Sequence, residues 1–210
     1  MSLVKNEKLI LFLQKLFDTN EKFAQEHDDN FFEQFREEQD PQLTILKCSD
    51  SRVQMESFDK TPQNGVFAVR NIGNQICTSE GSVDFGVEVL KTPFLLIIGH
   101  SGCGAIEAVL NNSEVPSKAI KRELATLKVQ QKSTQEAILE NINNQVTIAC
   151  AKYSDKIKNG ELVILGAVYD FKDDFGFGKG RVVLTNINNI TDKDAIEEVY
   201  KPSVKNLNCL

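Results

Sequence analysis

The chain has 210 residues, of which 41% are hydrophobic and 26% charged. This composition suits a globular protein that buries its core without disulfides or a structural metal. The formal net charge of -6 argues against a nucleic-acid partner, because phosphate binding needs a basic surface. No apolar run approaches the roughly 20 residues that span a bilayer, and the start of the chain lacks a signal-peptide pattern, so we expect no membrane partner and a cytoplasmic location.

The first part of the chain predicts amphipathic helices. From Leu3 to about Phe35, apolar residues recur at three- and four-residue intervals among charged residues, which is the helical period. The sequence has no internal repeat and no clear domain boundary. We therefore expect a single domain over residues 1–210, with a helical arm over 1–38 and an α/β core over 39–210.

Short apolar runs alternate with helical patterns in the rest of the chain. The runs that predict strands cover 43–46, 65–69, 94–98, 162–165 and 182–184, and the helical patterns cover 82–90, 105–110, 120–131 and 135–153. Continuously apolar strands that alternate with helices are typical of a mainly parallel sheet buried on both faces. The connection 171–180 is too short for a crossover helix, so we expect about four parallel strands and an antiparallel edge strand.

Five cysteines in a chain without an export signal indicate thiols or metal ligands rather than disulfides. Cys150 falls among apolar residues of a predicted helix, so we expect it in the core. Cys209 is next to the C-terminus and is expected to be exposed. The glycines between 176 and 180 lack the Lys-Ser/Thr ending of a phosphate loop and predict a flexible hairpin turn.

Metal-ligand residues follow two of the predicted strands. Cys48 ends the first strand, and His100 ends the third and begins His-x-x-Cys, which closes at Cys103. Ligands of open α/β sheets gather outside the carboxyl ends of the strands. Three protein ligands, with a fourth position left for water, are typical of a catalytic zinc site. By count alone, the alternative stays open that the two cysteines are inert packing and that His100 is a capping residue.

A carboxylate and a guanidinium follow Cys48 in the same short turn. Asp50 and Arg52 come directly after a buried strand, where charged groups must be paired or metal-bound if they are shielded from water. Arg52 can hold Asp50 and direct the remaining carboxylate oxygen toward a zinc-bound water. The pair therefore favours a catalytic metal site over inert packing.

The segment Cys48–Arg52, followed along the chain by His-x-x-Cys, resembles the β-class carbonic anhydrases. The similarity extends to Phe67–Asn74, which reads FAVRNIGN, and to Gly166–Asp170. It thus covers most of the chain from about Gln39 to Phe171. The N-terminal helices match the family only in general character.

The resemblance implies a zinc enzyme that catalyses the reversible hydration of carbon dioxide to bicarbonate and a proton. Cys48, His100 and Cys103 would bind Zn²⁺ in the α/β core. A zinc-bound hydroxide oriented by Asp50 would attack carbon dioxide, while Arg52 keeps Asp50 off the metal. Because two thiolates cancel the formal charge of Zn²⁺, the water should be acidified less than at a site of three imidazoles, so turnover should rise toward alkaline pH.

The resemblance also implies a substrate pocket near the zinc. Gln39 and Phe67 stand where plant-like members place pocket residues, and we assign Gly104, next to the second cysteine, to the same pocket. A pocket Tyr of those members has no counterpart here, since its place falls near Cys77.

The resemblance also bears on regulation, oligomeric state and substrate. A bicarbonate-regulated branch of the family uses a Trp, an Arg and a Tyr; Arg70 and Tyr169 are present, but Ile45 replaces the Trp, so we predict no such regulatory site. The family implies a homodimer or higher homo-oligomer with N-terminal helices laid across the neighbouring subunit. Two alternatives stay open: a hydrolase of carbon disulfide or carbonyl sulfide with the same zinc site, and a non-catalytic zinc-binding or bicarbonate-sensing module.

Overall fold

The computed structural model describes residues 6–34 and 36–210. The predicted helical stretch begins at Leu3 and ends near Phe35, and both of these residues lie outside the described ones. The chain divides into two compact units, Met1–Gln39 and Asp40–Leu210. In the described part of the chain, no helix is both long and apolar enough to cross a membrane.

The first unit contains two helices, α1 (Glu7–Glu26) and α2 (Asp29–Glu33). Asn6 caps α1, since its side chain accepts a hydrogen bond from the backbone N–H of Leu9 at 3.2 Å. No residue of α1 is buried. Its exposed apolar side chains are Leu9, Ile10, Leu11, Phe12, Leu13, Leu16 and Phe17. The helix therefore presents an apolar face that the unit itself does not cover.

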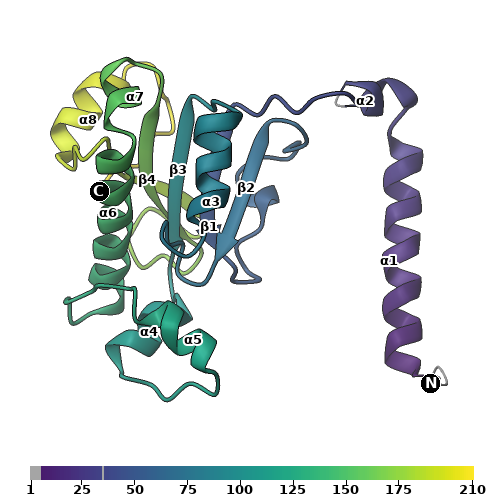
Figure 1. Cartoon of the computed structure of the whole chain (residues 1–210), viewed down its shortest axis with the longest axis horizontal. Helices are drawn as coiled ribbons and strands as arrows, with labels where there is room; N and C mark the ends of the chain where they lie inside the picture. The colour runs from purple at the N-terminus through teal and green to yellow at the C-terminus, as the bar shows by residue number, and fades with distance from the viewer. Residues whose placement is uncertain (1–5, 35) are drawn as a thin grey trace. The chain divides into compact units, whose positions relative to one another are not determined.

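Five strands form one sheet in the second unit, in the order β2-β1-β3-β4-β5 (Figure 1). They are β1 (Leu43–Cys48), β2 (Val66–Asn71), β3 (Phe94–His100), β4 (Val163–Asp170) and β5 (Arg181–Ile187). β1 pairs in parallel with β2 and β3, β3 pairs in parallel with β4, and β5 is antiparallel to β4. The predicted sheet of four parallel strands and an antiparallel edge strand is confirmed.

Helices and helical turns lie on both faces of the sheet and beyond one of its ends. They are a 3₁₀ turn (Met55–Ser57), α3 (Glu80–Asp84), a π-helical turn (Phe85–Val89), α4 (Gly104–Leu110), α5 (Lys118–Leu124), α6 (Thr134–Lys152), α7 (Ser154–Lys158) and α8 (Lys193–Tyr200). Figure 1 shows α3 and α6 along the sheet, with α4 and α5 beyond the end at which β3 stops. The main core lies between the sheet and α6, where Leu46, Leu95 and Ile97 pack with Ile142 and Val146.

Two helical predictions differ from the structure. The helix predicted over 120–131 ends at Leu124, because Leu127 is buried in the main core, where its side chain packs closely against Gly73. Gln75 Nε2 also donates to the carbonyl of Glu123 at 3.1 Å and holds the end of the helix. Helices α7 and α8 were not predicted, although Asp192 caps α8 by accepting a hydrogen bond from Ala195 N.

The prediction for Cys209 is wrong, whereas Cys150 lies in the core as expected. Cys209 is fully buried because the C-terminal residues pair with β5. Leu184 N donates to the carbonyl of Asn208 at 2.9 Å, and Leu210 N donates to the carbonyl of Leu184 at 3.0 Å. The end of the chain thus covers part of the outer edge of β5.

The loop between β4 and β5 is anchored by one buried carboxylate. Asp170 Oδ1 accepts hydrogen bonds from the backbone N–H groups of Lys172, Asp173 and Asp174 at 3.2, 2.9 and 3.0 Å, and Oδ2 accepts from Phe175 N at 2.9 Å. Burial alone would raise the pKa of Asp170, but these donors lower it below its ordinary value. Residues 172–175, which precede the predicted glycine turn, are therefore tied to the end of β4.

Substitution of Asp170 by Asn should destabilise the protein in a pH-dependent way. The folded-state pKa lies below that of the unfolded chain, so the ionised carboxylate stabilises the fold above about pH 4, and this contribution is lost as the pH falls through the folded-state pKa. Asp170→Asn leaves a single acceptor oxygen and adds a donor, and should lower the free energy of unfolding in urea by about 1–3 kcal/mol at neutral pH. The difference from wild type should shrink in acid. Asp155→Asn, at a side chain that is 91% exposed, is the control; equal stability of Asp170→Asn and wild type at neutral pH would contradict the assignment.

Candidate metal centre

Two adjacent strand ends bring three potential metal ligands together. Cys48 is the last residue of β1, and His100 is the last residue of β3. Cys103 follows a tight turn in which Gly102 has a φ of +61°, a conformation that glycine adopts readily. The ligand atoms of Cys48, His100 and Cys103 lie within 4.8 Å of one another, and all three residues are buried. The geometry groups the residues that the sequence predicted as ligands.

The imidazole of His100 is oriented for a ligand. Its Nδ1 lies 3.0 Å from the carbonyl of Ser101, and a carbonyl can only accept, so Nδ1 carries the hydrogen. The lone pair is then on Nε2, which is buried and has no hydrogen-bond partner among the described residues. A buried nitrogen without a partner costs free energy, and a cation at the cluster would supply that partner.

The two thiols of the cluster are strongly coupled. The neighbouring side chains of Cys103 and His100 lower the pKa of Cys48, and burial opposes this effect. The neighbouring Cys48 side chain and burial raise the pKa of Cys103. One proton therefore leaves the pair readily, and the second is retained because a second buried thiolate would be repelled by the first. A dication between the sulfurs would remove that repulsion.

The donor set fits Zn²⁺. Two thiolates and a neutral imidazole are the ligands that zinc prefers in proteins, and three protein ligands leave one tetrahedral position open. The cluster of Cys48, His100 and Cys103 could therefore hold a metal ion with room for a further molecule.

A carboxylate held by an arginine lies beside the cluster. Arg52 Nε donates to Asp50 Oδ1 at 2.9 Å, and an Nη atom donates to Asp50 Oδ2 at 2.7 Å and to the carbonyl of Gly102 at 3.1 Å. Asp50 Oδ2 is 3.9 Å from His100 Nε2. The hydrogen bonds from Arg52 hold the pKa of Asp50 well below its ordinary value. An ionised carboxylate thus lies next to the position that a metal bound by the cluster would occupy.

A buried lysine and an exposed arginine support the turn that carries this carboxylate. Lys47 is 1% exposed, and its Nζ donates to the carbonyl of Val53 at 2.7 Å. Arg70 donates to the carbonyl of Asp50 at 2.9 Å. Burial and the charge of Arg70 lower the pKa of Lys47 to about 8, and Glu56 acts in the opposite direction.

Sequence analysis missed the role of Lys47. The available signal was a lysine within the apolar strand Leu43–Cys48, since a buried ammonium needs acceptors.

The other predicted pocket residues lie in different places. Gly104 is the exposed first residue of α4, directly after Cys103, with open space beside its Cα. Phe67 is paired with Thr44, and the four residues from Thr44 to Cys48 span roughly 13 Å at a strand rise of about 3.3 Å. The structure therefore does not bring Phe67 to the cluster of its own chain. Gln39 is exposed in the first unit.

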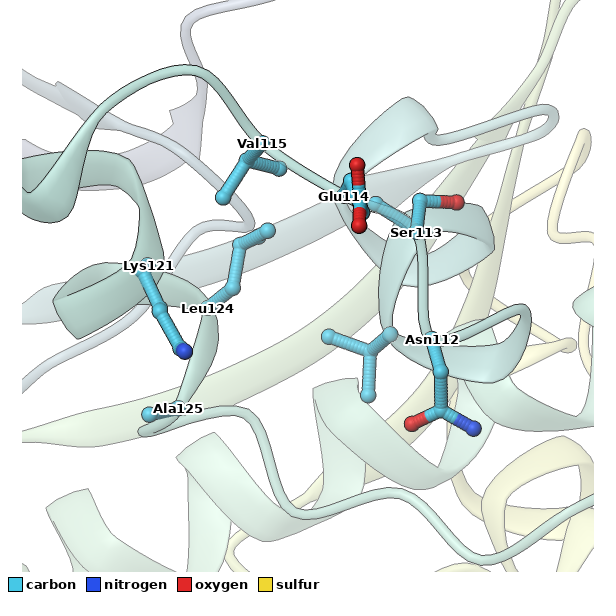
Figure 2. A pocket seen from close by; sticks show the side chains of 9 residues that line it. Asn112, Ser113, Glu114, Val115, Lys121, Leu124 and Ala125 are labelled. Atoms are coloured by element: carbon cyan, nitrogen blue, oxygen red, sulfur yellow. The ribbon is translucent and has the colours of Figure 1, made fainter.

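A hollow beside α4 and α5 is separate from the cluster (Figure 2). Val115 and Leu124 line it together with the charged side chains of Glu114 and Lys121. None of the three cluster residues, and neither member of the Asp50–Arg52 pair, belongs to its lining. The hollow is therefore not part of the candidate metal centre.

The fold and the cluster define an α/β protein with an open metal site, and comparisons with known proteins give its family. The family model described as carbonic anhydrase matches residues 43–179. The chain is 29% identical over 171 residues to carbonic anhydrase 2 of Mycobacterium tuberculosis (strain CDC 1551 / Oshkosh), which covers 74% of this chain and 80% of that protein.

Solved structures share the fold. The β-carbonic anhydrase CcaA has a TM-score of 0.73 at 20% identity and covers 86% of this chain and 89% of its own. A solved structure of a tetrameric β-carbonic anhydrase from Sordaria macrospora has a TM-score of 0.69 at 18% identity. The match covers 85% of this chain and 97% of that one. The chain belongs to the β-class carbonic anhydrase family of enzymes. The resemblance seen in the sequence is confirmed.

Proposed function

We propose that this enzyme catalyses the reversible hydration of carbon dioxide to bicarbonate and a proton, with Zn²⁺ held by Cys48, His100 and Cys103. The observation that carries the proposal is the Asp50 carboxylate, which Arg52 holds through both oxygens beside a cluster with three protein ligands. A structural zinc site has no use for such a carboxylate. Zinc bound at this cluster would act as a Lewis acid and, with two thiolate ligands, would make water a nucleophile increasingly as the pH rises above neutral.

Asp50 acts as an orienting acceptor in this proposal. Its lowered pKa keeps it ionised at working pH, so Oδ2 accepts a hydrogen bond from the attacking water and directs the oxygen lone pair toward carbon dioxide. Arg52 occupies the carboxylate from the other side and keeps Asp50 from becoming a fourth ligand. Gly104 leaves space beside the cluster in which carbon dioxide can bind.

A second copy of the chain would complete the substrate pocket. Phe67 lies far along β2 from the cluster of its own chain, so we propose that it lines the pocket of a neighbouring copy in a homodimer or larger homo-oligomer, and that Gln39 contributes to the same pocket. The exposed apolar face of α1 supports this assembly, because an apolar face of this size is usually covered by a partner. The tetrameric relatives from Sordaria macrospora are consistent with it.

Assembly through α1 predicts a clear effect of a charge on its apolar face. Phe12 is 61% exposed, and Phe12→Glu should lower the sedimentation coefficient relative to wild type, because an unpaired charge is costly in an apolar interface. Lys15→Glu changes the charge of the same helix by a larger amount and should sediment as wild type does. Sedimentation of the wild type as a single chain at micromolar concentration would contradict the proposed oligomer.

Loss of a ligand should remove both the metal and the activity. Purified wild type should carry about one zinc per chain, and Cys48→Ser should lose most of it and hydrate carbon dioxide near the uncatalysed rate. Elemental analysis and stopped-flow hydration measure the two quantities. Cys150→Ser is the matched control, since Cys150 is buried as Cys48 is and lies on α6, outside the cluster.

Retention of zinc and full hydration by Cys48→Ser would refute the ligand assignment. Hydrolysis of carbon disulfide or carbonyl sulfide by a zinc-loaded wild type that does not hydrate carbon dioxide would refute the assigned substrate and support the alternative hydrolase.

A further inference from the structure

Arg52 has to keep one orientation although much of it is in water. Its side chain is 52% exposed, and a long exposed side chain loses conformational entropy when an ion pair holds it in one geometry. The carboxylate of Asp50 and the carbonyl of Gly102 accept hydrogen bonds from the edge of the guanidinium and leave its faces for other contacts. A further contact is provided by Phe171, whose ring centroid lies 4.8 Å from Cζ of Arg52. This is a cation–π geometry.

The ring of Phe171 also contacts a metal ligand. It stacks on the imidazole of His100 with a centroid distance of 6.0 Å and an interplanar angle of 22°. The ring of Tyr169 is tilted against it at 5.9 Å. Phe171 therefore touches both the residue that grips Asp50 and the imidazole of the cluster.

The backbone of Phe171 is fixed by the same elements that build the cluster. Phe171 N donates to Ser101 Oγ at 3.1 Å, and Ser101 N donates to the carbonyl of Tyr169 at 3.1 Å. The carbonyl of Ser101 is the group that accepts from His100 Nδ1. The carboxylate of Asp170 anchors the residues that follow. Ser101 thus links the position of His100 to that of Phe171.

Packing in the hydrophobic core does not explain the position of the Phe171 ring. Two other phenylalanines of the same loop, Phe175 and Phe177, pack against the main hydrophobic core. Phe171 belongs to none of the three core clusters found among the described residues. Its ring contacts Arg52 and His100, which belong to the candidate metal centre, and Tyr169, which is paired with His100 on the next strand.

We propose that Phe171 is a positioning residue for Arg52. Its ring gives the guanidinium a surface on which only one orientation keeps both hydrogen bonds to Asp50, so that Asp50 stays directed past the metal instead of onto it. This inference rests on the proposed function for the role of Asp50. The contact between Phe171 and Arg52 can be tested without that function.

The first experiment measures how well Arg52 is held. Full-length protein, with and without metal, is treated with phenylglyoxal, and modification of each arginine is followed by peptide mass spectrometry. Phe171→Leu should raise the modification rate of Arg52 about two- to fivefold, which is what a cation–π contact at an exposed site is worth. Phe171→Tyr keeps the aromatic face and should retain the wild-type rate. Arg122, exposed on α5, serves as the internal reference.

Phe177→Leu is the matched control. It makes the same change in the same loop, but the ring of Phe177 faces Lys193 at 5.7 Å, so the rate at Arg52 should not change. An unchanged rate in Phe171→Leu, or equal increases in Phe171→Leu and Phe177→Leu, would overturn the proposal, because either result would mean that the loop is only structural.

The second experiment asks whether Asp50 is released. In cobalt-loaded protein, visible absorption reports the ligands of the metal. Phe171→Leu should change the spectrum of wild type, whereas adding Phe171→Leu to Asp50→Asn should leave the Asp50→Asn spectrum unchanged, because the released carboxylate is absent. A spectral change of the same size in both backgrounds would overturn the proposal. Failure of the wild type to bind metal or to hydrate carbon dioxide would instead refute the proposed function and leave the phenylglyoxal result to stand alone.

Discussion

The parallel pairing of β1 with β3 is the constraint on which the centre depends. It brings the carboxyl ends of two neighbouring strands to one edge of the sheet, so that Cys48 and His100 end side by side. Close packing behind the strands preserves this arrangement. A Cβ on Gly99 would come within 2.8 Å of Ile142 Cδ1 on α6, so the residue before His100 has to be small. Substrate chemistry at the strand ends thus rests on backbone hydrogen bonds and a tightly packed core.

The grouping of these residues also determines which charges lie together at the centre. Two thiols and an imidazole nitrogen without a hydrogen-bond partner, buried together, favour a dication. The turn after β1 adds a carboxylate next to them, and Arg52 donates a hydrogen bond to each of its oxygens. Lys47 and Arg70 hold the backbone of the same turn. In the proposed reaction the fold therefore holds an acceptor close to the metal and prevents it from becoming a ligand.

Much of this could be predicted from local sequence. Strands were recognised by their apolar runs, and Cys48 and His100 by their place at strand ends, because both signals depend only on neighbouring residues. Contacts between segments that are distant in the sequence could not be predicted in this way, because the neighbouring residues do not indicate them. Cys209 is buried by pairing with β5, α5 stops early because Leu127 enters the core, and Phe171 meets Arg52 only once β4 is folded beside β3. In each case tertiary packing decided the outcome over local preference.

The central claim is that the arginine-held carboxylate makes the cluster catalytic. The most direct test is the turnover of carbon dioxide hydration from about pH 6 to about pH 9, measured by stopped flow on zinc-loaded wild type and zinc-loaded Asp50→Asn. The account predicts a wild-type turnover that rises toward alkaline pH and a loss of about 100-fold in Asp50→Asn with zinc retained. Asp155→Asn, at an exposed position, should match wild type. Equal turnover of Asp50→Asn and wild type across this range would contradict the account.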